Sequence, residues 1–183
     1  MSKPSRISEI GELTVSILPI KMFGEPVLRE RTRPVERFDD ELARLADDLL
    51  ETMYDAPGVG LAATQVGMSL RFFVYDDGEG GPHSLANVEL DGLEGEQEWE
   101  EGCLSVPGLW FPTKRALKVR ARGFDVHGEP VSIEAEGLLA RILQHEADHV
   151  DGMLYLDRLA EEHRREALKQ IRERELSSGP RRG

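Results

Sequence analysis

Two histidines in the segment QHEADHVDG (144–152) have the spacing of a metal site. His145 and His149 are one i, i+4 step apart, so on a helix they differ by about 40° of rotation and both imidazoles can reach one ion. Glu146 follows His145 directly and would flank that ion, where a carboxylate can take a proton from bound water. The alternative is a helix with two core or surface histidines and an ordinary surface glutamate. We favour the metal site, because both histidines share the apolar stripe of the helix, where unpaired polar groups are costly.

Two histidines do not complete a catalytic site, which usually has three protein ligands and one open position. Cys103 is the only cysteine of the chain and lies in the segment EGCLSVPG (101–108). A free cysteine by itself is more often an inert buried residue than a ligand. Its neighbours favour the ligand, because Gly102 lets the backbone approach a bound group and Leu104 could point its amide N–H to the same place.

A third segment, GVGLAATQ (58–65), follows a helix-ending proline, and its glycines alone indicate only a turn. It is not a phosphate loop, because the Lys-Ser/Thr ending is missing. Gln65 is the informative residue. A neutral amide can donate a hydrogen bond to a developing oxyanion without competing for a metal.

The elements that must position these residues are indicated by hydrophobic periodicity. The helix over 137–150 would carry Leu138, Ile142 and both histidines on one face and end at Asp151-Gly152. The remaining expected elements are a helix over 40–54 capped by Asp39 or Asp40, a buried strand over 70–75, a half-exposed strand over 117–122, a hairpin over 124–135 and a surface helix over 157–176. Strands and helices do not alternate as βαβ units, so the fold class is α+β.

Length, charge and composition restrict the class of protein. The 183 residues favour a single catalytic domain, with about 1–13 and 177–183 expected to be flexible. A net charge of -12 argues against wrapping DNA, and seven acidic residues lie between Glu89 and Glu101 without a Lys or Arg. The lone cysteine fits a reducing compartment. Neither a signal peptide nor a run of roughly 20 apolar residues that could cross a membrane is visible, which predicts a cytoplasmic protein.

The C-terminal stretch 157–183 mixes eight Lys or Arg with six Asp or Glu in an otherwise acidic chain. A solvated amphipathic helix face is the favoured interpretation. The family resemblance described next implies an enzyme of nascent polypeptides, and for such an enzyme transient contact with the ribosome is the alternative that stays open.

The three segments together resemble the signature segments of the peptide deformylases, in the same order and at similar spacing. The resemblance covers about residues 15–160 and includes FGEPVLRERTRPV (23–35). It implies an α+β fold with antiparallel β-sheets packed around a central metal-binding helix. The sequence departs from the family at Val150, where Leu is usual, and at Asn87-Val88, where Asn-Pro is often found.

The resemblance implies a hydrolase that removes the formyl group from the N-terminal formyl-methionine of new polypeptides and releases formate, in the bacterial cytoplasm. It implies these roles: Cys103, His145 and His149 as metal ligands, Glu146 as acid and base, Gln65 and the Leu104 amide as oxyanion donors, and the backbone of Val59, Gly60 and Gly102 as the site that holds the peptide as an added strand. It favours Fe(II) as the one divalent metal ion, although a thiolate and two imidazoles also suit Zn(II), Ni(II) and Co(II).

Two finer expectations concern the side chains around this site. An apolar pocket for the methionine side chain is expected at Val59, Leu139 and Ile142. Asp148 is expected either to pair with Arg122 or to be solvated.

Two rival classes of protein stay open at this point. One is a zinc endopeptidase, whose third ligand usually lies downstream, and the other is a binding protein with a closed structural metal site.

Overall fold

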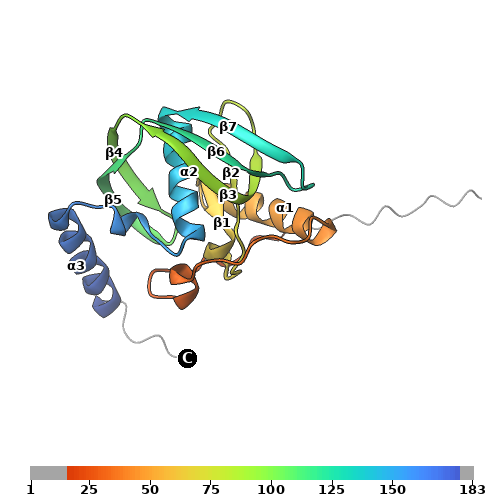
Figure 1. The fold of residues 1–183 in the computed structure, drawn as a ribbon. Helices are drawn as coiled ribbons and strands as arrows, with labels where there is room; N and C mark the ends of the chain where they lie inside the picture. The colour runs from red at the N-terminus through yellow and green to blue at the C-terminus, as the bar shows by residue number, and fades with distance from the viewer. Residues whose placement is uncertain (1–15, 178–183) are drawn as a thin grey trace, which may run out of the picture.

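The computed structural model describes residues 16–177 (Figure 1). The expected flexible segment 1–13 and residues 178–183 lie outside the described residues, whereas residue 177 ends a helix. The elements in chain order are the 3-10 turn η1 (Pro26–Arg29), α1 (Asp40–Asp55), β1 (Gly60–Ala62), η2 (Ala63–Val66), β2 (Phe72–Tyr75), β3 (His83–Glu94), β4 (Gln97–Cys103), β5 (Val106–Arg115), β6 (Lys118–Phe124), β7 (Pro130–Glu136), α2 (Gly137–Val150), η3 (Tyr155–Asp157) and α3 (Glu161–Ser177).

The strands form two antiparallel sheets. Five of them are ordered β1-β2-β3-β6-β7, and β4 and β5 form a separate two-stranded sheet. Figure 1 shows α2 in the middle, with the β4-β5 pair on one side and the larger sheet and α1 on the other. The α+β prediction, with antiparallel sheets around a central helix, is confirmed.

Strand β2 shows how the two main helices cover the larger sheet. Its four residues are all buried, and because side chains alternate along a strand, Phe73 and Tyr75 face one core while Phe72 and Val74 face another. The first core contains the apolar side of α2: Ala140, Leu143, Ala147 and Val150. The second contains the apolar side of α1: Leu42, Leu45, Ala46, Leu49 and Met53. The sheet is therefore covered by α2 on one face, and α1 covers the β1-β2 end of the other face.

Helix α1 agrees with its prediction at both ends. The Asp39 side chain accepts hydrogen bonds from the backbone N–H groups of Glu41 and Leu42, at 3.1 and 3.3 Å, which makes it the N-cap. The helix ends at Asp55, two residues before Pro57.

The face of α2 that carries the histidines differs from the prediction. Its core face is made of Ala140, Leu143, Ala147 and Val150, whereas Leu138 is 45% exposed at the mouth of a pocket. The helix is covered on two sides, by the larger sheet and by β4. Of the predicted stripe, Leu138 and His145 thus line the pocket and His149 lies buried behind it, whereas Ile142 belongs to the main core and also lines the pocket.

Hydrophobic periodicity did not predict strands β1, β3, β4 and β5, and of these β3 and β4 run through the acidic stretch between 89 and 101. Asp91 on β3 is partnered by Arg120 and Arg122 of β6, at 3.1 and 3.0 Å, so the outward carboxylates meet the outward guanidinium groups of the neighbouring strand. Strand β3 lies between β2 and β6, so it joins the two parts of the larger sheet that periodicity had predicted.

Asn87, which precedes Val88, the position that departs from the family pattern, interrupts β3. It has a positive φ of 55°, and the pairing with β6 shifts register between Ala86 and Glu89. Its side chain accepts from the Val35 N–H at 2.7 Å and donates to the Val35 carbonyl at 2.9 Å. Asn87 therefore fastens the segment before α1 to the sheet without a proline.

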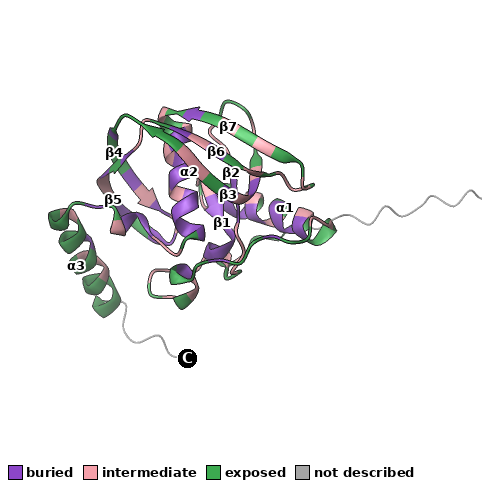
Figure 2. Ribbon diagram, in the orientation of Figure 1, coloured by how far each residue is buried: buried purple, intermediate pink, exposed green. Residues whose placement is uncertain are grey.

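The C-terminal surface helix begins four residues later than expected, because Asp157 belongs to the turn η3. Helix α3 is largely exposed (Figure 2), and its Ala167 and Ile171 pack on a cluster with Leu159 and Tyr155. No helix within residues 16–177 is both long enough and apolar enough to cross a bilayer.

Candidate functional site

The structure brings Cys103, His145 and His149 together, with their donor atoms all within 4.8 Å of one another. The Cys103 Sγ lies 3.3 Å from His149 Nε2, which lies 3.2 Å from His145 Nε2. Donors around a tetrahedral ion are about 3.3–3.6 Å apart when the bonds are about 2.0–2.3 Å long. The three donors therefore fit the coordination shell of one small divalent ion.

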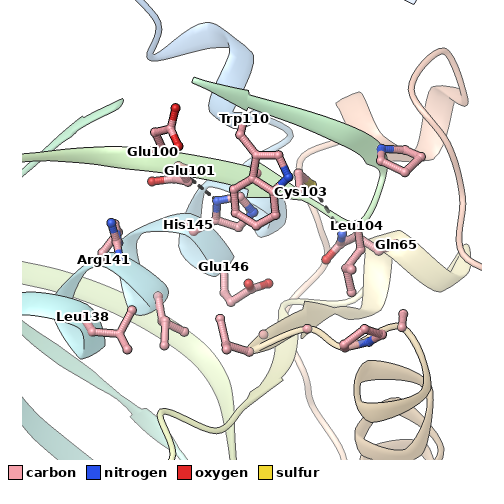
Figure 3. A pocket seen from close by; sticks show the side chains of 18 of the residues that line it. Gln65, Glu100, Glu101, Cys103, Leu104, Trp110, Leu138, Arg141, His145 and Glu146 are labelled. Atoms are coloured by element: carbon pink, nitrogen blue, oxygen red, sulfur yellow. Dashed lines mark hydrogen bonds and ion pairs between the residues drawn. The ribbon is translucent and has the colours of Figure 1, made fainter. Parts of the chain in front are cut away.

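Glu101 orients the first of these ligands. His145 Nδ1 donates to Glu101 Oε1 at 2.6 Å, which leaves Nε2 directed at the cluster (Figure 3). Burial would raise the pKa of Glu101, but the hydrogen bonds from His145 and Arg115 outweigh burial and hold that pKa at about 2. Glu101 is thus an ionised acceptor. Sequence reasoning missed it, although the period of two along a strand places it on the same face as Cys103.

Arg115 links Glu101 to helix α2. Its guanidinium donates to Glu101 at 2.6 and 3.1 Å and to Asp148 at 2.5 Å, and its side chain is only 3% exposed. Arg158 completes the network with bonds of 2.6 and 3.1 Å to Asp148. No local pattern in the sequence pointed to Arg115, because its partners come from other elements.

The expected pairing of Asp148 with Arg122 is wrong. Arg122 pairs with Asp91 on the outer face of the larger sheet, 3.0 Å away. Asp148 is instead buried between α2 and β5, where Arg115 can reach it. The alternative of a solvated Asp148 is excluded as well.

Glu146 lies beside the cluster with an exposed fraction of 3%, and its Oε2 has no hydrogen-bond partner within residues 16–177. Burial raises the pKa of this carboxyl to about 7. A Cβ on Gly60 would lie 2.2 Å from Glu146 Oε1, so only glycine leaves room for the carboxylate against β1. Gly60 thereby lets Glu146 point into the pocket.

Gln65 lies on the other side of the thiol. Its Oε1 accepts from the Ala62 N–H at 2.9 Å, and this bond directs Nε2 toward Ser105 Oγ at 3.1 Å and Cys103 Sγ at 3.6 Å. Figure 3 shows Gln65 and Leu104 next to Cys103, at the end of the pocket opposite to Leu138. The amide donor is therefore held at the cluster.

A pocket of about 400 Å³ opens onto these groups. Eight of the nine predicted site residues line it: Val59, Gly60, Gln65, Gly102, Cys103, Leu104, His145 and Glu146. The ninth, His149, is buried behind them. Ile142 also lines the pocket, but the expected Leu139 does not; it packs on the main core, and Leu138 takes the position at the pocket wall.

The pocket lies where two strands each have one unpaired edge. Strand β1 is the end strand of the larger sheet, and β4 pairs only with β5 within the described chain. The Val59 carbonyl already accepts from the Asp76 N–H at 3.0 Å. Because backbone groups alternate in direction along an antiparallel strand, Gly60 is the residue whose N–H and C=O face the open edge.

Gly102 on β4 makes room for an aromatic ring. A Cβ at this position would come within 2.9 Å of three ring atoms of Trp110, so the indole lies directly against the backbone of β4. Trp110 was not predicted to take part, and it lines the mouth of the pocket with an exposed side chain.

We expect Arg115→Met to lower the free energy of unfolding by about 3 kcal/mol or more, because it leaves Glu101 and Asp148 as buried charges without their shared cation. Urea unfolding of the metal-free protein would measure this cost without a contribution from metal binding. Arg122→Met is the matched control and should cost less than about 1 kcal/mol, because its ion pair with Asp91 is exposed. Equal costs for the two variants would contradict the prediction.

Comparison with known proteins gives one consistent result. The family model described as polypeptide deformylase matches residues 17–165. A peptide deformylase of Acidothermus cellulolyticus is 55% identical over 162 residues, which are 88% of this chain and 89% of that protein.

Solved structures agree with this match. The crystal structure of a peptide deformylase from Legionella pneumophila is similar with a TM-score of 0.83 and 42% identity, over 90% of this chain and 99% of that one. The peptide deformylase from Thermus thermophilus gives 0.82 and 44%, over 85% and 93%. The chain belongs to the polypeptide deformylase family.

Proposed function

We propose that this protein is a metal-dependent hydrolase that removes the formyl group from the N-terminal formyl-methionine of newly made polypeptides and releases formate. The observation that carries the proposal is the cluster of Cys103, His145 and His149 beside the buried Glu146, at the end of a pocket bounded by two strand edges. Such a site suits an extended peptide whose terminal amide reaches the cluster.

The open edges of β1 and β4 support the way in which the peptide would bind. An extended chain entering between them can pair with the backbone of Gly60 and of Gly102, which is the β-augmentation mode. Its first side chain would then lie on the apolar wall formed by Val59, Leu138 and Ile142. This wall suits the unbranched side chain of methionine.

Cys103, His145 and His149 are the residues that would hold the metal. When bound there, a divalent ion supplies Lewis acidity and lowers the pKa of a water on it to about 7. The family favours Fe(II), and a thiolate with two imidazoles also accepts Zn(II), Ni(II) or Co(II). The site differs from the closed structural type because it offers three donors next to an open pocket.

Glu146 is proposed to move the protons. Its unpartnered oxygen and its pKa of about 7 suit a group that takes a proton from the attacking water and returns it to the leaving amine. The Gln65 amide and the Leu104 N–H are proposed to donate hydrogen bonds to the formyl oxygen as it gains charge. The bond from the Ala62 N–H to Gln65 holds this donor in place.

The compartment and the partners follow from the substrate. Formylated nascent chains are made in the bacterial cytoplasm, so we place the enzyme there, acting on polypeptides as they emerge. Ribosome contact through the exposed face of α3 stays a prediction.

Formate release from formyl-Met-Ala by protein prepared without oxygen tests the function directly. We expect formate and Met-Ala in equal amounts, with no cleavage of the Met-Ala bond. Acetyl-Met-Ala is the matched control and should react much more slowly, because the acetyl carbonyl is more crowded. Hydrolysis of internal peptide bonds without formate would favour a zinc endopeptidase and overturn the proposal.

Glu146→Ala should keep the metal and lower kcat by about 100- to 10,000-fold, because general acid–base catalysis is lost while the ligands remain. Elemental analysis after gel filtration would measure metal content alongside the kinetics. Glu162→Ala, which removes an exposed carboxylate from α3, is the control and should leave turnover unchanged. Wild-type activity in Glu146→Ala would refute the role of this residue.

If iron is the native metal, activity should fall during exposure to air, because an Fe(II)–thiolate site exposes Cys103 to oxidation. Mass spectrometry of the peptide that contains Cys103 should show added oxygen in step with the loss. The same protein reconstituted with Zn(II) should keep its activity and an unmodified thiol. Unchanged activity of the iron-loaded protein after prolonged aeration would count against iron.

A further inference from the structure

Arg141 is a pocket residue that the reaction described above does not use. It lies on α2 one turn before His145 and lines the pocket. Figure 3 shows its side chain extending from α2 toward β4, at the same end of the pocket as Leu138. Its Nη1 is buried, and its guanidinium makes no hydrogen bond or ion pair with any residue of the described range 16–177.

The neighbouring carboxylates do not partner Arg141. Glu101 is occupied by Arg115 and His145, and Glu100 lies beyond ion-pair distance on the exposed side of β4. Glu146 points to Gly60 instead. Among the pocket-lining residues of the described chain, Arg141 is the only Lys or Arg. Its guanidinium donors have no acceptor within that part of the chain.

A buried N–H without an acceptor costs free energy, and an incoming acceptor would recover that cost. The guanidinium group matches a carboxylate best, because its planar fork can donate two parallel hydrogen bonds. The apolar surroundings of Leu138, Ile142 and Trp110 would strengthen such a pair by limiting its contact with water. The geometry thus describes a subsite for an anionic group.

We propose that Arg141 binds the carboxylate of an acidic side chain at the third residue of the formyl-methionyl polypeptide, which makes Arg141 a specificity-determining residue. The inference rests on the proposed function and on the peptide binding as an extended strand. In a strand, the first and third side chains lie on the same face. The first is assigned to the wall that includes Leu138 and Ile142 of α2, so the third also faces α2, where Arg141 lies.

The competing occupant of this subsite is a backbone carbonyl of the peptide. A carbonyl would accept one hydrogen bond from Arg141 in every substrate, whatever the third side chain is. A carboxylate subsite instead distinguishes Glu from Gln, which have the same shape and differ in charge. The two interpretations therefore predict different ratios of kcat/KM.

The test compares kcat/KM for formyl-Met-Ala-Glu-Ser amide and formyl-Met-Ala-Gln-Ser amide, whose amidated ends leave no terminal carboxylate. We expect the Glu peptide to be preferred about tenfold by the wild-type enzyme, which corresponds to ~1.4 kcal/mol. In Arg141→Met the ratio should fall to one or below, because Glu100, Glu101 and Glu146 remain around the pocket. In Arg141→Lys it should be intermediate, since the charge is kept without the planar fork.

Two controls separate this subsite from general electrostatics. Arg172→Met removes an equal charge from the exposed α3 and should leave the ratio as in the wild type. Moving the Glu or Gln to the second residue should give a ratio close to one, because that side chain faces away from α2.

Each outcome decides between the hypotheses. A wild-type ratio near one with rapid formate release, a ratio that Arg141→Met leaves unchanged, or a preference that appears only at the second residue would overturn the subsite while the proposed function stands. Failure to release formate from either peptide would overturn the proposed function itself.

Discussion

The buried guanidinium of Arg115 is the interaction on which the geometry of the site depends. It joins Glu101 of β4 to Asp148 of α2, and these two ion pairs hold the cysteine-bearing strand against the histidine-bearing helix. Buried charges are tolerated only when they are paired with good geometry, so the network strongly disfavours any shift between the two elements. Because Glu101 also accepts from His145, the same network sets the orientation of the His145 ring. The same contacts therefore orient the His145 ring and stabilise the packing of β4 against α2.

Helix α2 can carry the site because it is covered on two sides. Its small and branched apolar residues pack on the larger sheet, and its polar residues face β4 and the pocket. A helix exposed on one side could not keep a glutamate as desolvated as Glu146, whose raised pKa arises from burial. The close approach of Gly60 completes this enclosure from the side of β1. Glu146 is thus shielded from solvent, although it lines a pocket.

Two open strand edges, one on β1 and one on β4, border the pocket. Exposed edges are usually a liability, because they can pair with other molecules. Here they border the pocket, and the two glycines at these edges leave room for neighbouring side chains, Gly60 for Glu146 and Gly102 for Trp110. Trp110 and Arg141 lie around the same space and differ in chemistry, one offering an aromatic surface and the other unused donors. The proposed subsite at Arg141 would extend the contacts of the pocket beyond the first residue of a bound peptide.

The sequence by itself determined the features that depend on one element at a time. The i, i+4 spacing of His145 and His149, the cap at Asp39 and the α+β pattern follow from helix and strand periods, and the three signature segments identify the family. Cys103 could be assigned as a ligand only through those segments taken together. The tertiary structure alone decided that Arg115 pairs with Asp148 and that β3 and β4 are strands despite their acidic residues. The reason is physical: periodicity is set by neighbouring residues, whereas the partner of a buried charge or of a strand edge is set by the packing of elements distant in the chain.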